Sequence, residues 1–86
     1  MTIVANLKTF TFAHNIVVMD GDKVITATKA NMKNIPEVIS ELAVANNCNK
    51  IILTGNKTFT KGISDKIKQC YSAKYKENNE LEIECL

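Results

Sequence analysis

The sequence contains no arginine and no tryptophan, and only one histidine, one proline and three glycines in 86 residues. All eleven cationic side chains are lysines. Arginine is the side chain that reads guanine edges and clamps phosphates with two parallel hydrogen bonds, so its absence argues against sequence-specific DNA recognition. Ten asparagines and ten isoleucines accompany the lysines, a bias that we attribute to an AT-rich genome and that suits a small phage or mobile-element protein.

Further absences narrow the chemistry. Cys48, Cys70 and Cys85 are widely spaced and form no Cys-x-x-Cys pair, which favours reduced thiols in an intracellular, cytoplasmic protein over disulfides or a zinc site. His14 falls in a predicted turn, where we expect a solvated side chain with no catalytic partner. We therefore predict no catalytic residue, no metal site and no cofactor. Neither a signal peptide nor an apolar run of about 18 residues is found, so we expect no membrane association.

Length and charge limit the number of domains and the kinds of partner that the sequence predicts. Residues 1–86 are expected to form one α/β domain, because a chain of this length has no room for a second. The formal net charge of +2 is too small to imply nucleic-acid binding by itself.

The first third of the chain predicts three strands. Residues 2–12 alternate well enough for one long strand, and residues 16–19 and 24–28 form two more. Asp20-Gly21 predicts a two-residue type I′ hairpin, a turn that needs positive φ at both central residues. Asp20 and Asp22 are a candidate acidic pair, but turn chemistry explains them better, since Asp before Gly is what such turns select.

A helix is predicted over residues 35–46. Asn34 and Glu37 have the spacing of a capping box, and Pro36 suits the first turn. Asn46-Asn47 can end the helix in the left-handed conformation. Its apolar residues recur with the spacing of one buried face: Ile35, Val38, Ile39, Leu42 and Ala43.

The segment 50–62 is the centre of the predicted architecture. Ile51, Ile52 and Leu53 form an uninterrupted apolar run, which is typical of an inner strand buried on both faces. The segment Thr54-Gly55-Asn56 ends this strand. Thr58 or Thr60 is expected to cap a second helix, which runs from about residue 60 to residue 75.

The loop between this strand and the second helix is the candidate binding site. A strand end, a glycine, a polar loop and a helix N-terminus make a place where an anion can bind. The loop matches neither the Walker A nor the G-x-G-x-x-G pattern. Two interpretations stay open: an ordinary strand–helix turn beside a solvated lysine-rich face, or a phosphate or nucleic-acid contact with a tyrosine, Tyr71 or Tyr75, stacked on a base. The candidate contact residues are Gly55, Asn56, Lys57, Thr58, Thr60, Lys61, Lys68 and Tyr71.

Residues 81–86 alternate and predict a last strand at a sheet edge, with Glu82 and Glu84 on its wet side. The predicted order is strand-strand-strand-helix-strand-helix-strand. It implies a five-stranded mixed sheet covered on one or both faces, with the two later strands parallel to the first.

This element order resembles the ribonuclease H-like fold in its smallest form, and the related fold of some small ribosomal proteins, over nearly the whole chain. The stretch NIPEVISELAVANNCNKIILTGN is also similar in rhythm to the helix and strand of Holliday-junction-resolvase-like domains. Active members of that superfamily hold two divalent metals with an Asp in the first strand and acids at the ends of later strands. Residues 2–12 contain no acid, and Asn6 is the nearest polar residue, so the resemblance does not extend to a two-metal nuclease.

Three classes of function follow. We expect a non-catalytic interaction or assembly module that acts through a sheet edge or an apolar patch on a protein partner or a second copy of the chain. The alternative is a nucleic-acid-binding module that uses the lysine-rich loop and second helix. An enzyme would have to use Lys57, Thr58, Thr60 and His14, from which no nucleophile, base and orienting group can be assembled.

Overall fold

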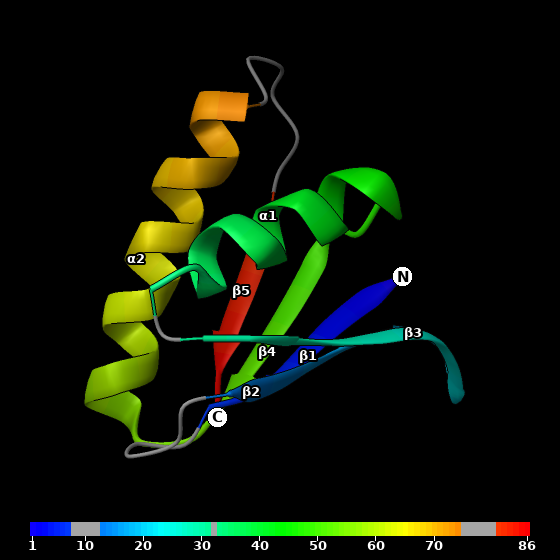
Figure 1. Cartoon of the computed structure of the whole chain (residues 1–86), viewed down its shortest axis with the longest axis horizontal. Helices are drawn as coiled ribbons and strands as arrows, with labels where there is room; N and C mark the ends of the chain where they lie inside the picture. Colours follow the sequence, from blue (N-terminus) through cyan, green and yellow to red (C-terminus); the bar gives the residue numbers. More distant parts are fainter. Residues whose placement is uncertain (8–12, 32, 75–80) are drawn as a thin grey trace.

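The computed structural model describes residues 1–7, 13–31, 33–74 and 81–86. Its elements are, in chain order, β1 (Thr2–Asn6), β2 (His14–Asp20), β3 (Lys23–Ala30), α1 (Ile35–Ala45), β4 (Lys50–Thr54), α2 (Lys57–Lys74) and β5 (Glu82–Cys85). The strands form one sheet in the order β3-β2-β1-β4-β5 (Figure 1). β4 runs parallel to β1 and β5, whereas β2 is antiparallel to both of its neighbours. The predicted class, element order and five-stranded mixed sheet are confirmed.

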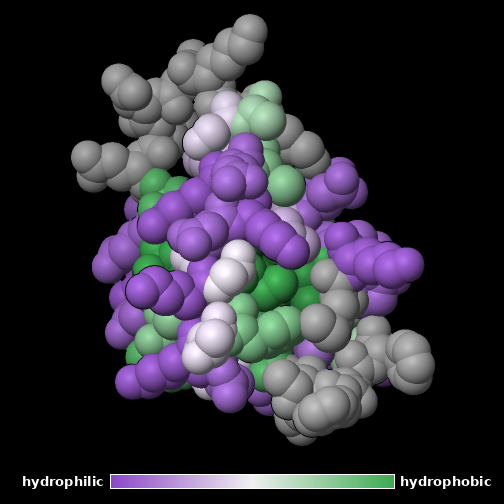
Figure 2. Space-filling view, turned by 90° about the vertical axis from the view of Figure 1, so that its left-hand side faces the viewer, coloured by the Kyte–Doolittle hydropathy of each residue, from purple (hydrophilic) through white to green (hydrophobic). Residues whose placement is uncertain are grey.

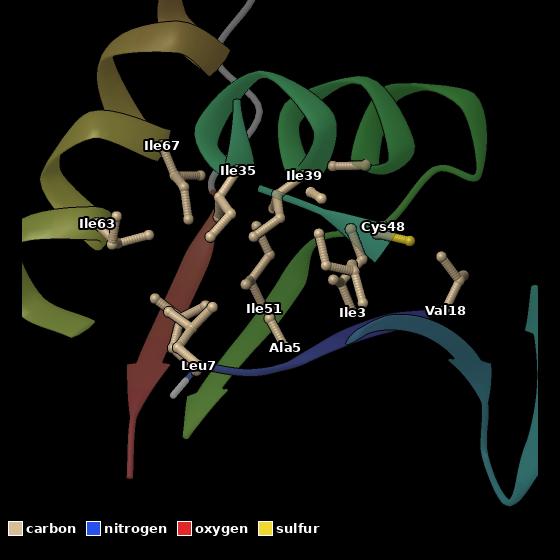
Figure 3. Close-up of a cluster of buried hydrophobic side chains, with 14 of the residues drawn as sticks. Ile3, Ala5, Leu7, Val18, Ile35, Ile39, Cys48, Ile51, Ile63 and Ile67 are labelled. Carbon is tan, nitrogen blue, oxygen red and sulfur yellow. The ribbon is translucent and has the colours of Figure 1, made fainter. Parts of the chain in front are cut away.

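Both helices lie on the same side of the sheet and pack against each other (Figure 1). The core lies between them and the sheet, as Figure 3 shows. Ile35 and Ile39 enter it from α1, Ile63 and Ile67 from α2, and Ile51 from β4. None of the helices that the structure describes is long and apolar enough to cross a membrane.

The strand pattern places alternate side chains on the covered face. Ile3, Ala5 and Leu7 are buried, whereas Val4 between them is only half-buried. β1 itself ends at Asn6, and residues 8–12 of the predicted long strand lie outside the described residues. The Leu7 N–H still donates to the Thr54 carbonyl oxygen (2.8 Å), so the chain continues beside the end of β4.

β4 corrects one prediction about burial. Ile51 and Leu53 are fully buried, but Ile52 is only half-buried. The expectation of a strand buried on both faces is therefore wrong, because both described helices lie over the same face. At the sheet edge, β5 confirms the prediction: Glu82 and Glu84 are exposed, and Glu84 Oε2 lies 3.7 Å from Lys50 Nζ.

The hairpin between β2 and β3 differs from the predicted turn. Asp20 pairs with Lys23, so the two loop residues are Gly21 and Asp22, one position later than predicted. Only Gly21 has positive φ (62°), which excludes a type I′ turn because that turn needs positive φ at both residues. The pairing also shifts between Val18 and Met19, which leaves Ile25 as the extra residue of a β-bulge.

His14 also differs from its prediction. It is the first residue of β2 and is buried, not a solvated turn residue. Its ring centroid lies 6.4 Å from that of Phe59, which belongs to α2. The physical reason is alternation, since His14 has the same parity as the buried Ile16 and Val18.

The predicted end of α1 is confirmed, because Asn47 has the left-handed φ of 53°. The predicted capping box is wrong: the Asn34 side chain makes no cap hydrogen bond. Asn34 Oδ1 instead accepts the Asn31 N–H (3.0 Å), while Asn31 Oδ1 accepts the N–H groups of Lys33 and Asn34.

Candidate functional site

Gly55, the first residue of the predicted binding loop, is required by a close approach of two backbones. It has a φ of 138°, and a Cβ at this position would overlap the carbonyl oxygen of Leu7. Leu7 is held there by its N–H bond to Thr54. The glycine is thus explained by the join between the ends of β1 and β4, without any ligand.

Asn56 occupies the N-terminus of α2. Its Oδ1 accepts the N–H groups of Thr58 (3.0 Å) and Phe59 (3.3 Å). These are among the donors that an anion at a helix N-terminus would use. Asn56 therefore takes the capping role that we had assigned to Thr58 or Thr60, and α2 begins at Lys57, three residues earlier than predicted.

Two of the eight candidate contact residues lie in the interior. Thr60 is fully buried, and its Oγ1 donates to the Lys57 carbonyl oxygen (3.2 Å). Tyr71 is 8% exposed and belongs to the core stripe of α2 together with Ile63 and Ile67. The outer surface therefore does not present the Tyr71 ring for stacking on a base, and Tyr75 lies outside the described residues.

The remaining candidates are exposed at the start and along one side of α2. Lys57, Lys61 and Lys68 fall within about 40° around the helix axis. Asp65 lies one helical turn from both Lys61 and Lys68, and so offsets part of their charge. Figure 2 shows that the α2 side of the molecule is mostly hydrophilic around a smaller hydrophobic area. Lys57, Lys61 and Lys68 therefore form a modest basic stripe along α2.

A second candidate surface lies on the opposite side of the sheet. We call it the open face, because the structure describes no helix over it. The strand register places its side chains in rows. In the central row, Val4 pairs with Val17 and with Ile52, and Val17 pairs with Ala27. In the next row, Met19 lies between Thr2 and Val24. Six apolar residues form this continuous patch across four strands: Val4, Val17, Met19, Val24, Ala27 and Ile52.

Polar residues border the patch on two sides. At one end, Asn6 pairs with Asn15, and the Thr54 hydroxyl donates to Asn6 Oδ1 (3.2 Å). At the β5 edge, the rim consists of Glu82 and the Lys50–Glu84 ion pair. An apolar centre within a polar rim is the usual anatomy of a protein–protein interface.

The open face meets an unpaired strand edge at β3. Within the described part of the chain, no strand pairs with the outer side of β3. Val24 and Ile25 are 55% and 41% exposed. An eight-residue edge strand with exposed apolar side chains is a ready template for pairing with another strand.

The sequence predictions named an apolar patch without placing residues on it, and they assigned a sheet edge only to residues 81–86. A signal was present, since residues 16–19 and 51–53 are apolar at both parities. Two helices packed side by side cover one face of a five-stranded sheet, so the second apolar parity must lie on the other face.

Within residues 1–7, 13–31, 33–74 and 81–86, no three His, Cys, Asp or Glu side chains lie close enough together to hold a metal ion. Burial raises the pKa of the Cys48 thiol above its ordinary value, which keeps it protonated and weakly nucleophilic. Comparison with protein-family models and with curated proteins finds no match for this chain.

Proposed function

We propose that this protein is a non-catalytic interaction module that binds a protein partner through the open face of its sheet. One observation carries the proposal: six apolar side chains are contiguous on a face without a described helix. In soluble proteins, large continuous apolar patches with a polar rim are typical of interaction sites. The patch lies on hydrogen-bonded strands, so a partner can bind it without ordering a loop first.

The half-buried state of the central residues fits this role. Val4, Val17 and Ile52 already shield one another partly, so each still exposes apolar area that a partner can bury. Burying that area contributes about 25 cal/mol per Å² before the cost of association. A sheet face made of aliphatic side chains suits a flat protein surface better than a small molecule, which binds in a concave pocket.

The ribonuclease H-like relationship is part of the proposal. It is supported by the order of the elements along the chain, which is three strands, a helix, a strand, a helix and a strand. The acids that the active members of that superfamily use have no counterpart in β1 or at the end of β4, where Thr54, Gly55 and Asn56 stand. The proposal is therefore a shared framework without the nuclease chemistry.

The experiment is a quantitative co-purification from the cells that express the protein. Val17→Ser and Ile52→Ser weaken the open face, and Lys57→Ala with Lys61→Ala removes charge from α2 as the matched control. We expect the same protein partner to be lost from both open-face variants and kept by the lysine variant, with folding checked by circular dichroism. Partners that stay bound to the folded open-face variants would contradict the proposal.

The second candidate function is nucleic-acid binding by α2, supported by the exposed stripe of Lys57, Lys61 and Lys68. Its affinity for single-stranded RNA or DNA should fall steeply with salt, because lysine contacts to phosphate release counterions. Replacing all three lysines with alanine should abolish binding at low salt. Binding that survives this replacement would exclude the stripe as the contact surface.

A further inference from the structure

We infer that the occupant of the open face is a second copy of the chain, whose own open face packs against it. The two sheets then lie face to face, and the helices of both copies lie on the outside. This inference rests on the proposed function, because it names the partner of the same surface. It starts from the charges of the open face, which have opposite signs at its two edges.

Four charged side chains of the described strands lie at open-face positions. Lys29 lies on β3, two residues beyond the patch. On the other side, Lys50 of β4 pairs in register with Glu82 of β5 and forms the ion pair with Glu84. The β3 edge therefore carries one positive charge, and the edge formed by β4 and β5 carries a net charge of −1, from one lysine and two glutamates. The face as a whole is neutral, and its two edges attract each other.

The apolar patch fixes where the twofold axis of such a pair passes. The patch extends from β3 to β4, so its centre lies between β2 and β1. Two patches overlap fully only when the axis passes through that centre, in the plane between the sheets. With the axis along the strands, β2 lies over β1 of the other copy and β3 lies over β4. Val17 then packs on Val4, and the small Ala27 packs on the large Ile52.

The charges fix the direction of the axis. Aligned sheets keep their strands within about 30° of each other, so the axis runs either along or across the strands. An axis across the strands places β5 over β5 and brings Glu84 close to Glu82 of the other copy, twice. An axis along the strands brings the β5 edge of each copy to the β3 edge of the other, where Glu84 meets Lys29. Like charges brought together disfavour an interface and opposite charges favour it, so the axis runs along the strands.

The side chains of the open face suit a second sheet better than they suit a nucleic acid. Sheet faces that bind single-stranded nucleic acid stack the bases on aromatic side chains. None of the described residues at open-face positions is aromatic, and their lysines and glutamates are equal in number. Val4, Val17 and Ile52 are β-branched, and such side chains pack well against another pleated surface.

The size of the overlap indicates how strongly the two copies associate. Four strands about 4.8 Å apart, each with about five residues at about 3.3 Å per residue, cover roughly 300 Å² of sheet. Side-chain relief increases the surface lost by both copies together to on the order of 1,000 Å², the lower limit for a specific interface. The dimer is therefore reversible, with a dissociation constant in the micromolar range or weaker.

The experiment measures self-association of the full chain by sedimentation equilibrium over the micromolar to millimolar range. Lys29→Glu and Glu84→Lys, each alone, should weaken the dimer about tenfold, because each places like charges at both edge contacts. An equimolar mixture of these two variants should associate as strongly as wild type, because both contacts of the mixed dimer join opposite charges. Lys61→Glu, the same charge change on exposed α2, is the matched control and should leave the dimer unchanged. Circular dichroism checks that each variant is folded.

Three results would overturn the inference. The first is a chain that stays monomeric up to millimolar concentration. The second is an equal effect of Lys29→Glu and Lys61→Glu, or a dimer that Val17→Ser leaves intact. The third is a tighter dimer of Glu84→Lys, which is the result that an axis across the strands predicts. If a monomeric chain still loses a protein partner on Val17→Ser, the inference fails while the proposed function stands.

Discussion

The two faces of the sheet are built from the same strands and the same kinds of residue, yet their side chains differ in burial. On the covered face, Ile3, Ile51 and Leu53 are fully buried beneath α1 and α2. On the open face, Val4 and Ile52 alternate with them and stay half-buried. The difference comes from the number of helices rather than from the strands, since the two helices lie over one face. A strand with apolar residues at both parities therefore places one set in the core and offers the other set to a partner.

The largest effect that distinguishes the faces is expected in the core. Ile51→Ala should lower the free energy of unfolding by about 2–5 kcal/mol, because it leaves a cavity among the residues of the covered face. Ile52→Ala, one residue away on the open face, should cost only about 1 kcal/mol, because that side chain keeps part of its surface in water. Urea unfolding of the two variants measures the difference, and equal costs would mean that something covers the open face.

The join between β1 and β4 is the next test, because it aligns the strands that carry both faces. Gly55→Ala should destabilise the protein by about 2–3 kcal/mol, through its positive φ and the overlap with the Leu7 carbonyl. Gly62→Ala is the control: a Cβ there meets no atom within 4 Å, and in the interior of α2 it should stabilise by about 0.5–1 kcal/mol. Thermal unfolding should move the two variants in opposite directions. If Gly55→Ala leaves the stability unchanged, the close approach to Leu7 does not explain the glycine.

A smaller effect tests what holds α2 over the covered face. Asn56→Ala should cost about 1 kcal/mol, because the N–H groups of Thr58 and Phe59 lose their acceptor. Thr58→Ala should change the stability little, because the Thr58 side chain is exposed and Asn56 holds the cap position. Denaturant midpoints of the two variants decide between the caps, and the reverse ranking would restore the threonine as the cap.

The smallest expected effect is the alkaline dependence of stability due to Cys48. Burial raises the pKa of the Cys48 thiol in the folded chain above the ordinary value of 9.0. At a pH above that value, the unfolded chain loses the thiol proton while the folded chain keeps it, so stability falls as the pH rises. Below 9.0 both states are protonated and the contribution is constant. Cys48→Ala should flatten this alkaline decline in urea titrations, and an unchanged slope would assign the decline to other groups.

Much of the fold is predictable because local signals agree. The alternation that makes β1 a strand, the apolar run that makes β4 a strand and the left-handed Asn47 each follow from short-range chemistry. His14 was missed because Ala13-His14-Asn15 resembles a turn, although the parity of His14 matches that of Ile16 and Val18. The hairpin turn was misplaced by one residue because glycine suits either central position.

The candidate site was predicted less well, for two physical reasons. Asparagine and threonine are both good N-caps, so the sequence left the start of α2 ambiguous within three residues. Thr60, one of the candidate caps, is buried instead. The open face depends on which parity the helices cover, which is a tertiary property. Comparing the number of helices with the number of strands indicates that one face can stay uncovered. Only the strand register shows that Val4, Val17 and Ile52 lie in one row on that face.

The most direct test of where the protein makes contact is site-specific photo-cross-linking in the cells that express it. A benzoylphenylalanine at Ala27 probes the open face where it meets the β3 edge, and one at Lys61 probes the basic stripe of α2. We predict a protein adduct, with a second copy or with another chain, at position 27 and little product at position 61. Adducts confined to position 61 would contradict the assignment of the open face as the working surface.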